Sequence, residues 1–173
     1  MKLDEYQKKA RSTAIYSSQL VYPTLGLCGE VGEVINACRF RKTNDIPKEI
    51  GDLEWYIANV ATDSLLKLSE VCEEEAFDFD AFNAWSWEEA CEELTVECSI
   101  VAENVKKTIR DNYGVLTDDR RKNVRQALKR AMQALSAIAN DWGYGLEECA
   151  EMNLDKLFSR KERGKLKGDG DNR

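Results

Sequence analysis

Four acidic side chains are spaced in a way that points to chemistry. Glu30 and Glu33 lie three residues apart in "GEVGEV", and Glu49 and Asp52 lie three residues apart in "KEIGD". Residues three apart on a helix share one side of it, and both segments otherwise carry the apolar spacing of buried helices. The acids are therefore predicted to lie within or beside apolar faces. An unpaired carboxylate there is costly unless it is protonated, paired with a cation or bound to a metal ion.

A divalent metal ion would resolve this conflict. Carboxylates that converge from two antiparallel helices repel one another unless a cation lies among them, and oxygen ligands suit hard ions such as Mg²⁺, with Mn²⁺ as an alternative. Gly29 and Gly32 beside the first pair favour a site, because each costs a helix about 1 kcal/mol relative to alanine and lets a ligand or helix approach the backbone. The competing interpretation is that the acids are solvated surface groups. Spacing alone does not decide between the two.

The elements that must position these acids are helices. The chain contains only two prolines and little β-branched alternation, so the sequence predicts an all-α helical bundle. Asn44 or Asp45 can cap the helix that begins near Pro47, and Ser86 followed by Glu89 is a capping-box pattern. Helices are predicted at about residues 3–20, 23–40, 47–66, 67–76, 86–112, 117–142 and 146–160.

The 173 residues correspond to about one domain. A single domain is predicted over residues 1–160, followed by a basic, glycine-containing tail over residues 161–173. Inside the domain, residues 64–133 are either an insertion or a degenerate second repeat.

The repeat hypothesis comes from a short alignment of the two halves. It places Glu30 on Glu97 and Asp52 on Arg130, so a second copy would have lost most of its acids. The two remaining acids, Glu33 and Glu49, fall on Ile100 and Ala127. Because the match is short, chance similarity between amphipathic helices explains it equally well.

Composition narrows the classes of function. The formal net charge of −7 argues against a nucleic-acid or anionic-membrane partner. No signal peptide or run of eighteen apolar residues is found, which predicts a cytoplasmic location. The chain has no histidine, which excludes Ser-His-Asp catalysis and histidine-based zinc sites. The chain has six cysteines and no CxxC pair, which predicts that the cysteines are small buried apolar residues. The alternative is an incidental disulfide or a reactive thiol.

Three blocks of sequence carry a resemblance to a known family. The segments "LGLCGEVGEV", "EIGDLEWYIANVA" and "GYGLEECAEMNLDKLFSRKERG" together resemble the MazG-like all-α nucleoside triphosphate pyrophosphohydrolases, a superfamily that includes dimeric dUTPases and dCTP pyrophosphatases. The blocks cover about half of the chain. This chain departs from compact members of the family over residues 64–133, because the corresponding region of those members is far shorter.

The resemblance implies Mg²⁺-dependent cleavage of (deoxy)nucleoside triphosphates between the α and β phosphorus atoms, which yields a monophosphate and pyrophosphate. Glu30, Glu33, Glu49 and Asp52 would hold the metal, and Glu33 is the acid expected to act as general base. Residues expected to contact the substrate are Lys156, Asn153, Tyr56, Arg160, Asn59 and Trp55, each with a purely structural role as its alternative. The sequence does not indicate which base is bound.

Two other functions remain open at this stage. One is a catalytically weak, nucleotide-binding or regulatory member of the same family that acts through a partner. The other is a carboxylate-bridged iron protein, which lacks the histidines that such a site would use. The resemblance also implies a homodimer, although a chain with an internal repeat can be self-sufficient.

Overall fold

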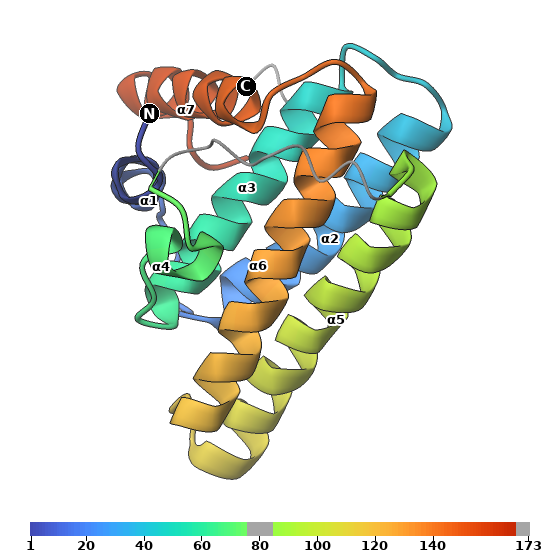
Figure 1. Cartoon of the computed structure of the whole chain (residues 1–173). Coiled ribbons are helices and arrows are strands. Elements are labelled where there is room, and N and C mark those ends of the chain that lie inside the picture. Colours follow the sequence, from blue (N-terminus) through green and yellow to red (C-terminus); the bar gives the residue numbers. More distant parts are fainter. Residues whose placement is uncertain (76–84, 169–173) are drawn as a thin grey trace.

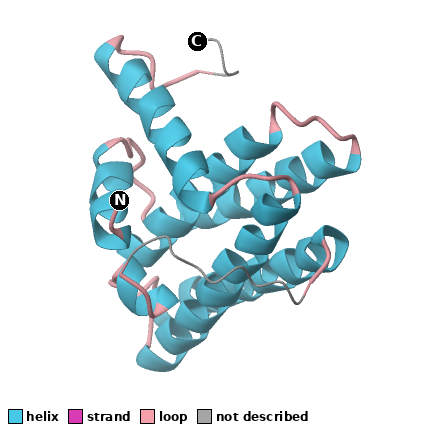
Figure 2. Ribbon diagram, turned by 45° about the horizontal axis from the view of Figure 1, so that its top comes forward, coloured by secondary structure: helices cyan, strands magenta, loops and turns pink. Residues whose placement is uncertain are grey.

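The chain is helical throughout the part that the structure describes. The computed structural model describes residues 1–75 and 85–168, and within these ranges it contains seven α-helices and no strand (Figure 1, Figure 2). The helices are α1 (Leu3–Ser12), α2 (Val21–Arg39), α3 (Ile46–Asp63), α4 (Leu68–Cys72), α5 (Trp87–Asn112), α6 (Asp118–Asp141) and α7 (Leu146–Glu162). The predicted all-α class is confirmed.

Two helical hairpins form a four-helix bundle. Helices α2 and α3 make the first hairpin and α5 and α6 the second, with α2 packed against α5 and α3 against α6. Helices α1, α4 and α7 lie on the α3 side of this bundle, and α7 crosses the end of α3 (Figure 1). Helix α3 is therefore surrounded by other helices, and most of its residues are buried. The acids on α3 must share this environment with the core.

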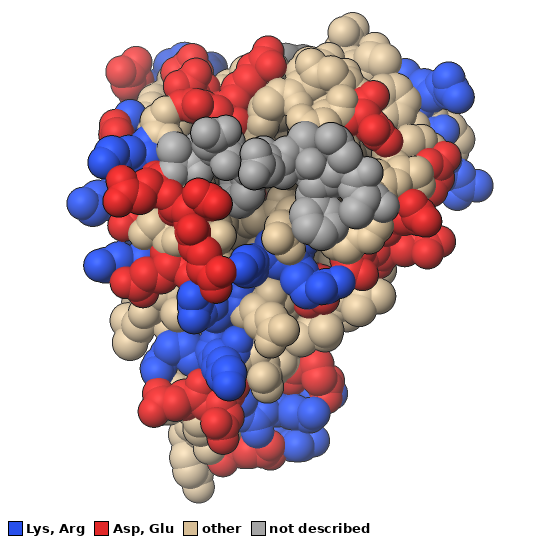
Figure 3. Space-filling view, in the orientation of Figure 1, with Lys and Arg blue, Asp and Glu red and all other residues tan. Residues whose placement is uncertain are grey.

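Polar contacts hold the short helix α4 against α6. Arg125 donates to the carbonyl oxygen of Glu70 at 2.7 Å, and Lys129 pairs with Glu73 at 2.6 Å. Figure 3 shows the corresponding pattern on the surface, where basic side chains run down the middle of this face beside a group of acidic ones. These contacts are solvent-exposed, so they orient α4 more than they stabilise it.

The prediction of a helix over residues 3–20 is wrong beyond Ser12, where α1 ends. The following segment is held in a non-helical path by Asp63, at the C-terminal end of α3. Asp63 accepts hydrogen bonds from the Tyr16 hydroxyl at 3.1 Å and from the Leu20 backbone N–H at 2.7 Å. Serine, threonine and isoleucine in this stretch have modest helix propensity, so these tertiary contacts determine its path.

The predicted helix starts are largely confirmed. Ser86 and Glu89 form the reciprocal capping box at the start of α5. Thr117 accepts a backbone N–H of the first turn of α6 at 3.4 Å. Pro47 lies in the first turn of α3, but Asp45, at the N-cap position of that helix, makes no capping hydrogen bond.

Several sequence predictions concern larger regions. Residues 64–133, the predicted insertion or repeat, contain α4, α5 and most of α6. The stretch between the helices predicted at residues 67–76 and 86–112 falls mostly on residues 76–84, outside the described part of the chain, and residues 169–173 of the tail also lie outside it. The division into one domain and a tail stays a prediction. No described helix is long and apolar enough to cross a bilayer.

Candidate metal and phosphate site

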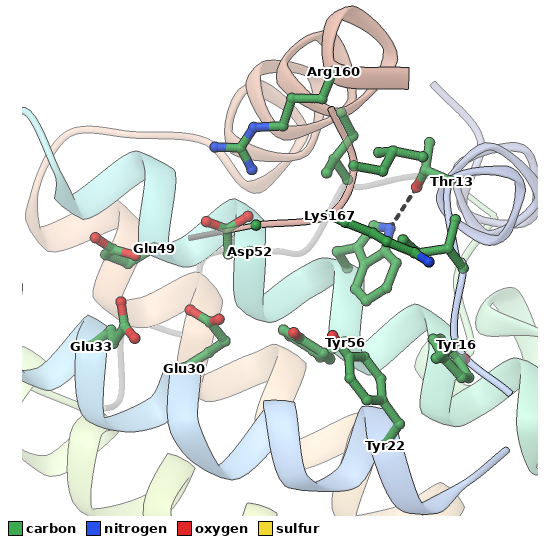
Figure 4. A pocket seen from close by; sticks show the side chains of 15 residues that line it. Thr13, Tyr16, Tyr22, Glu30, Glu33, Glu49, Asp52, Tyr56, Arg160 and Lys167 are labelled. Carbon is green, nitrogen blue, oxygen red and sulfur yellow. Dashed lines mark hydrogen bonds between the residues drawn. The ribbon is translucent and has the colours of Figure 1, made fainter. Parts of the chain in front are cut away.

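Three of the four predicted acids converge between the helices of the first hairpin. Glu30 on α2 and Glu49 and Asp52 on α3 each place one carboxylate oxygen within 4.8 Å of the others, and all three are partly buried (Figure 4). Glu33, one turn along α2, lines the same pocket but lies outside this group and is exposed. The pairing of two helices thus gathers acids that are far apart in the sequence.

The electrostatics of the group show a shortage of positive charge. Burial, together with the negative charges of Asp52, Glu33 and Glu49, raises the pKa of the Glu30 carboxyl to about 8, and Lys156 partly opposes this rise. A carboxyl in this state favours a proton or a cation beside it. Among the described residues, the candidate ligands of this group are carboxylate oxygens alone, and their chemistry fits Mg²⁺ or Mn²⁺.

Helix α7 orients Asp52. The Lys156 ammonium lies 2.8 and 2.6 Å from the two carboxylate oxygens, and the side-chain amide of Asn153 donates to one of them. This contact depends on Gly51, because a Cβ there would lie 2.5 Å from the Cys149 carbonyl oxygen. Lys156 and Asn153, predicted to contact the substrate, therefore stand behind the acids and fix one of them.

The acids form one end of a cavity of about 670 Å³, within the range of roughly 300–1,000 Å³ typical of small-molecule sites. Helices α2 and α3 form its floor, while Leu157 and Arg160 of α7 and residues 166–168 form another side. The segment after α1 contributes Thr13 and Ile15. The cavity thus has a charged end and a largely apolar one.

Four aromatic rings line the other end of the cavity (Figure 4). Tyr16 and Tyr22 stack with ring centroids 4.9 Å apart, and Trp55 meets Tyr56 edge-on at 4.9 Å. The indole N–H of Trp55 donates to the Thr13 hydroxyl at 2.8 Å, which fixes the ring. Such a wall can pack against a planar, apolar ring.

A second glycine makes room for one of these rings. A Cβ at Gly26 would lie 2.0 Å from the Tyr56 ring, so only glycine accommodates the observed position. By contrast, nothing in the described chain lies within 4 Å of a Cβ built at Gly29 or Gly32. No described helix approaches these two glycines, so that half of the prediction is wrong for the described residues, and the approach of a ligand stays a prediction. Gly26 and Gly51 are the glycines at which neighbouring helices come close.

Two cationic side chains of the described residues line the cavity. Arg160 is only 4% exposed, and its guanidinium points toward the acidic end (Figure 4). Lys167 reaches the cavity because the chain turns back after α7, where Gly164 has a φ of 65° and the Lys165 N–H bonds the Arg160 carbonyl oxygen at 2.7 Å. From the sequence, Lys167 was one of several tail cations that could meet a phosphate, with a solvated surface role as the favoured interpretation.

Asn59 does not line the cavity. It is fully buried, donates to the Trp55 carbonyl oxygen at 2.9 Å and accepts from the Tyr16 hydroxyl at 3.2 Å. These contacts place Asn59 behind the aromatic wall, and its contact with a substrate stays a prediction. Among the other predicted substrate contacts, Trp55, Tyr56 and Arg160 do line the cavity. Tyr16 was missed because its segment was predicted to be helical.

A phage protein is similar to this chain. Over 80 residues the chain is 39% identical to the Gene 37 protein of Mycobacterium phage L5, and the match covers 46% of this chain and 70% of the phage protein. The name of that protein states no activity or ligand. No model of a known protein family matches the sequence. No solved structure matches significantly.

Proposed function

The chain belongs to the same family as the Gene 37 protein of Mycobacterium phage L5, and we propose that it is a Mg²⁺-dependent nucleoside triphosphate pyrophosphohydrolase. The observation that carries the proposal is the convergence of Glu30, Glu49 and Asp52 at one end of a cavity whose other end is aromatic. A triphosphate has its charge at one end and a planar base at the other. The resemblance of the acid pairs and of α7 to the MazG-like family supports the same reading.

The acidic end would hold the metal. Bound Mg²⁺ would neutralise charge on the phosphates and provide a nucleophilic water near neutral pH. Lys156 and Asn153 hold the Asp52 carboxylate in a fixed orientation, which is the usual task of groups behind a metal ligand. Glu33 lines the cavity but stands outside the converging group, and this supports the proposal that its carboxylate, free of the metal, would accept the proton of the attacking water.

The remaining side chains would position the substrate. Arg160 and Lys167 bring positive charge to a cavity whose acids would otherwise repel a polyphosphate. Tyr22 and Tyr56 offer ring faces to a nucleobase. Attack on the α phosphorus would release a nucleoside monophosphate and pyrophosphate, an activity suited to removing or adjusting nucleotides in the precursor pool.

A product assay tests the proposal. The protein is incubated with a panel of ribo- and deoxyribonucleoside triphosphates and Mg²⁺, and the products are separated by ion-exchange chromatography. We expect equal amounts of monophosphate and pyrophosphate, no turnover in EDTA, and loss of turnover in Glu49→Gln. Glu92→Gln, which changes an exposed acid on α5, is the matched control.

Two results would contradict the proposal. Orthophosphate as the main product would place the cleavage elsewhere in the triphosphate. Metal-dependent nucleotide binding without turnover would favour the regulatory alternative. The homodimer implied by the resemblance is a separate expectation, which light scattering on the purified protein tests.

A further inference from the structure

The α2–α3 hairpin aligns, without gaps inside its helices, with part of the longer α5–α6 hairpin. When α2 is aligned with α5 so that Glu30 falls on Glu97, and α3 with α6 so that Asp52 falls on Arg130, the core positions of the two hairpins coincide. Aligned residues that are buried in both hairpins include Leu27 with Leu94, Val34 with Val101, Ile50 with Leu128, and Ile57 with Leu135. Amphipathic helices can share such a pattern by chance, so burial alone does not establish a repeat.

A hydrogen bond that occurs in both hairpins goes beyond this pattern. Asp63, the last residue of α3, accepts the backbone N–H of Leu20 at the start of α2 at 2.7 Å. Asp141, the last residue of α6, accepts the backbone N–H of Trp87 at the start of α5 at 2.8 Å. In the alignment Leu20 falls on Trp87 and Asp63 falls on Asp141. Apolar periodicity does not require this bond, so its recurrence at matched positions indicates a structural repeat.

The acidic group of the first hairpin has an altered counterpart in the second. Glu97, which is only 7% exposed, occupies the position of Glu30, and the Arg130 guanidinium, at the position of Asp52, lies 2.9 Å from it. Arg130 also bonds Glu93 at 2.7 Å, and the Trp85 ring lies 5.8 Å from the guanidinium carbon. A cation thus lies among carboxylates at the place where the first hairpin gathers acids.

We propose that the α5–α6 hairpin is a second copy of the metal-binding hairpin in which the Arg130 guanidinium takes the place of the metal ion. The chain then has one metal centre and one copy that carries its own permanent cation. The guanidinium suits this task because it stays charged and its planar donors match carboxylate oxygens. The inference rests on the proposed function only in treating the α2–α3 acids as metal ligands.

If Arg130 takes the place of a metal ion, the surrounding side chains should be able to bind a metal ion once Arg130 is replaced. An ion pair with a purely structural role does not predict this. If the guanidinium replaces a metal ion, then replacing Arg130 by an acid should create a divalent-ion site with Glu93 and Glu97 as further ligands. The variant is Arg130→Asp combined with Ala127→Glu, which restores acids at the positions aligned with Asp52 and Glu49. Without metal this variant should be less stable, because several carboxylates then lie together with no cation.

Mn²⁺ binding and thermal unfolding test the proposal. Electron paramagnetic resonance counts the Mn²⁺ ions bound per chain, and circular dichroism gives the melting temperature in EDTA and in Mn²⁺. We expect the double variant to bind one more Mn²⁺ than the wild type and to gain more melting temperature from Mn²⁺. Arg130→Lys keeps a cation, and Lys122→Asp makes the same change of charge as Arg130→Asp alone at an exposed position of α6. Both should behave like the wild type.

The outcomes separate this inference from the proposed function. A double variant that keeps the wild-type helix content but binds no additional Mn²⁺ overturns the inference, and so does one that stays unfolded in Mn²⁺ as well as in EDTA. A variant that folds only in Mn²⁺ supports it. If the wild type binds no Mn²⁺, the proposed function loses its metal, whereas a Mn²⁺ site gained by the variant would still identify the second hairpin as a copy with ligand geometry.

Discussion

Metal binding to this protein should release a proton. Burial, with the neighbouring carboxylates, raises the pKa of Glu30 to about 8 in the metal-free protein. A divalent ion binds the ionised carboxylate, so the ion must displace the proton that Glu30 holds below this pH. The apparent affinity for Mg²⁺ or Mn²⁺ should therefore fall about tenfold for each pH unit below 8 and level off above it.

The size of the effect follows from the same pKa. At pH 7 Glu30 is about nine-tenths protonated, so each bound ion should release about 0.9 proton, and the affinity at pH 6 should be about 100-fold weaker than its plateau. Calorimetric titrations with Mn²⁺ in two buffers of different ionisation enthalpy measure the proton count directly. Repeating them between pH 6 and 9 gives the slope.

A variant identifies the source of the proton. Glu30→Gln cannot release a proton, so its weaker Mn²⁺ binding should be nearly independent of pH between 6 and 8. Glu92→Gln, on the surface of α5, should retain the wild-type slope. Equal affinity of the wild type at pH 6 and pH 8, with no proton released, would refute the reasoning.

Three further predictions concern activity and stability. Lys156→Met should lower metal-dependent pyrophosphate release about 10- to 100-fold, as is typical when a metal ligand loses its supporting group, and steady-state kinetics checks this. Gly26→Ala should destabilise the fold by about 1–3 kcal/mol, because its Cβ meets the Tyr56 ring, whereas Gly29→Ala, with open space, should be neutral or up to about 1 kcal/mol stabilising in urea unfolding. Glu54 is fully buried, its carboxyl oxygens have no hydrogen-bond partner among the described residues, and burial raises its pKa, so it folds protonated. Its cost grows as the pH rises above the pKa of the unfolded chain, and Glu54→Met should stabilise the protein more at pH 8 than at pH 5 in urea unfolding.

Helical periodicity predicted on which side of their helices the acids lie, and the family resemblance favoured their convergence. The spacing of Glu30, Glu49 and Asp52 relative to apolar residues placed all three near the core, and two adjacent helices joined by a short loop must pack together. Periodicity fixes the side of a helix but not how far a side chain lies from a neighbour. For this reason Glu33, one turn from Glu30, was predicted to join the group but stands outside it.

Tertiary contacts determined what periodicity could not. The path of the segment after α1 depends on Asp63, which lies more than forty residues away in the sequence. Lys156 was predicted to contact the substrate from its place on α7, yet the close approach at Gly51 brings it onto Asp52. Such contacts depend on which helices meet, and local sequence carries little information about that.

The side chain that orients Asp52 is added late in the synthesis of the chain. Lys156 follows Asp52 by 104 positions, so the ribosome completes both helices that carry the acids long before it makes the residue that orients one of them. Until α7 has been synthesised and has docked at Gly51, the emerging hairpin holds its carboxylates without that ammonium group. Under the proposed function, turnover would have to wait until translation has passed α7, and fragments that stop before it should release no pyrophosphate.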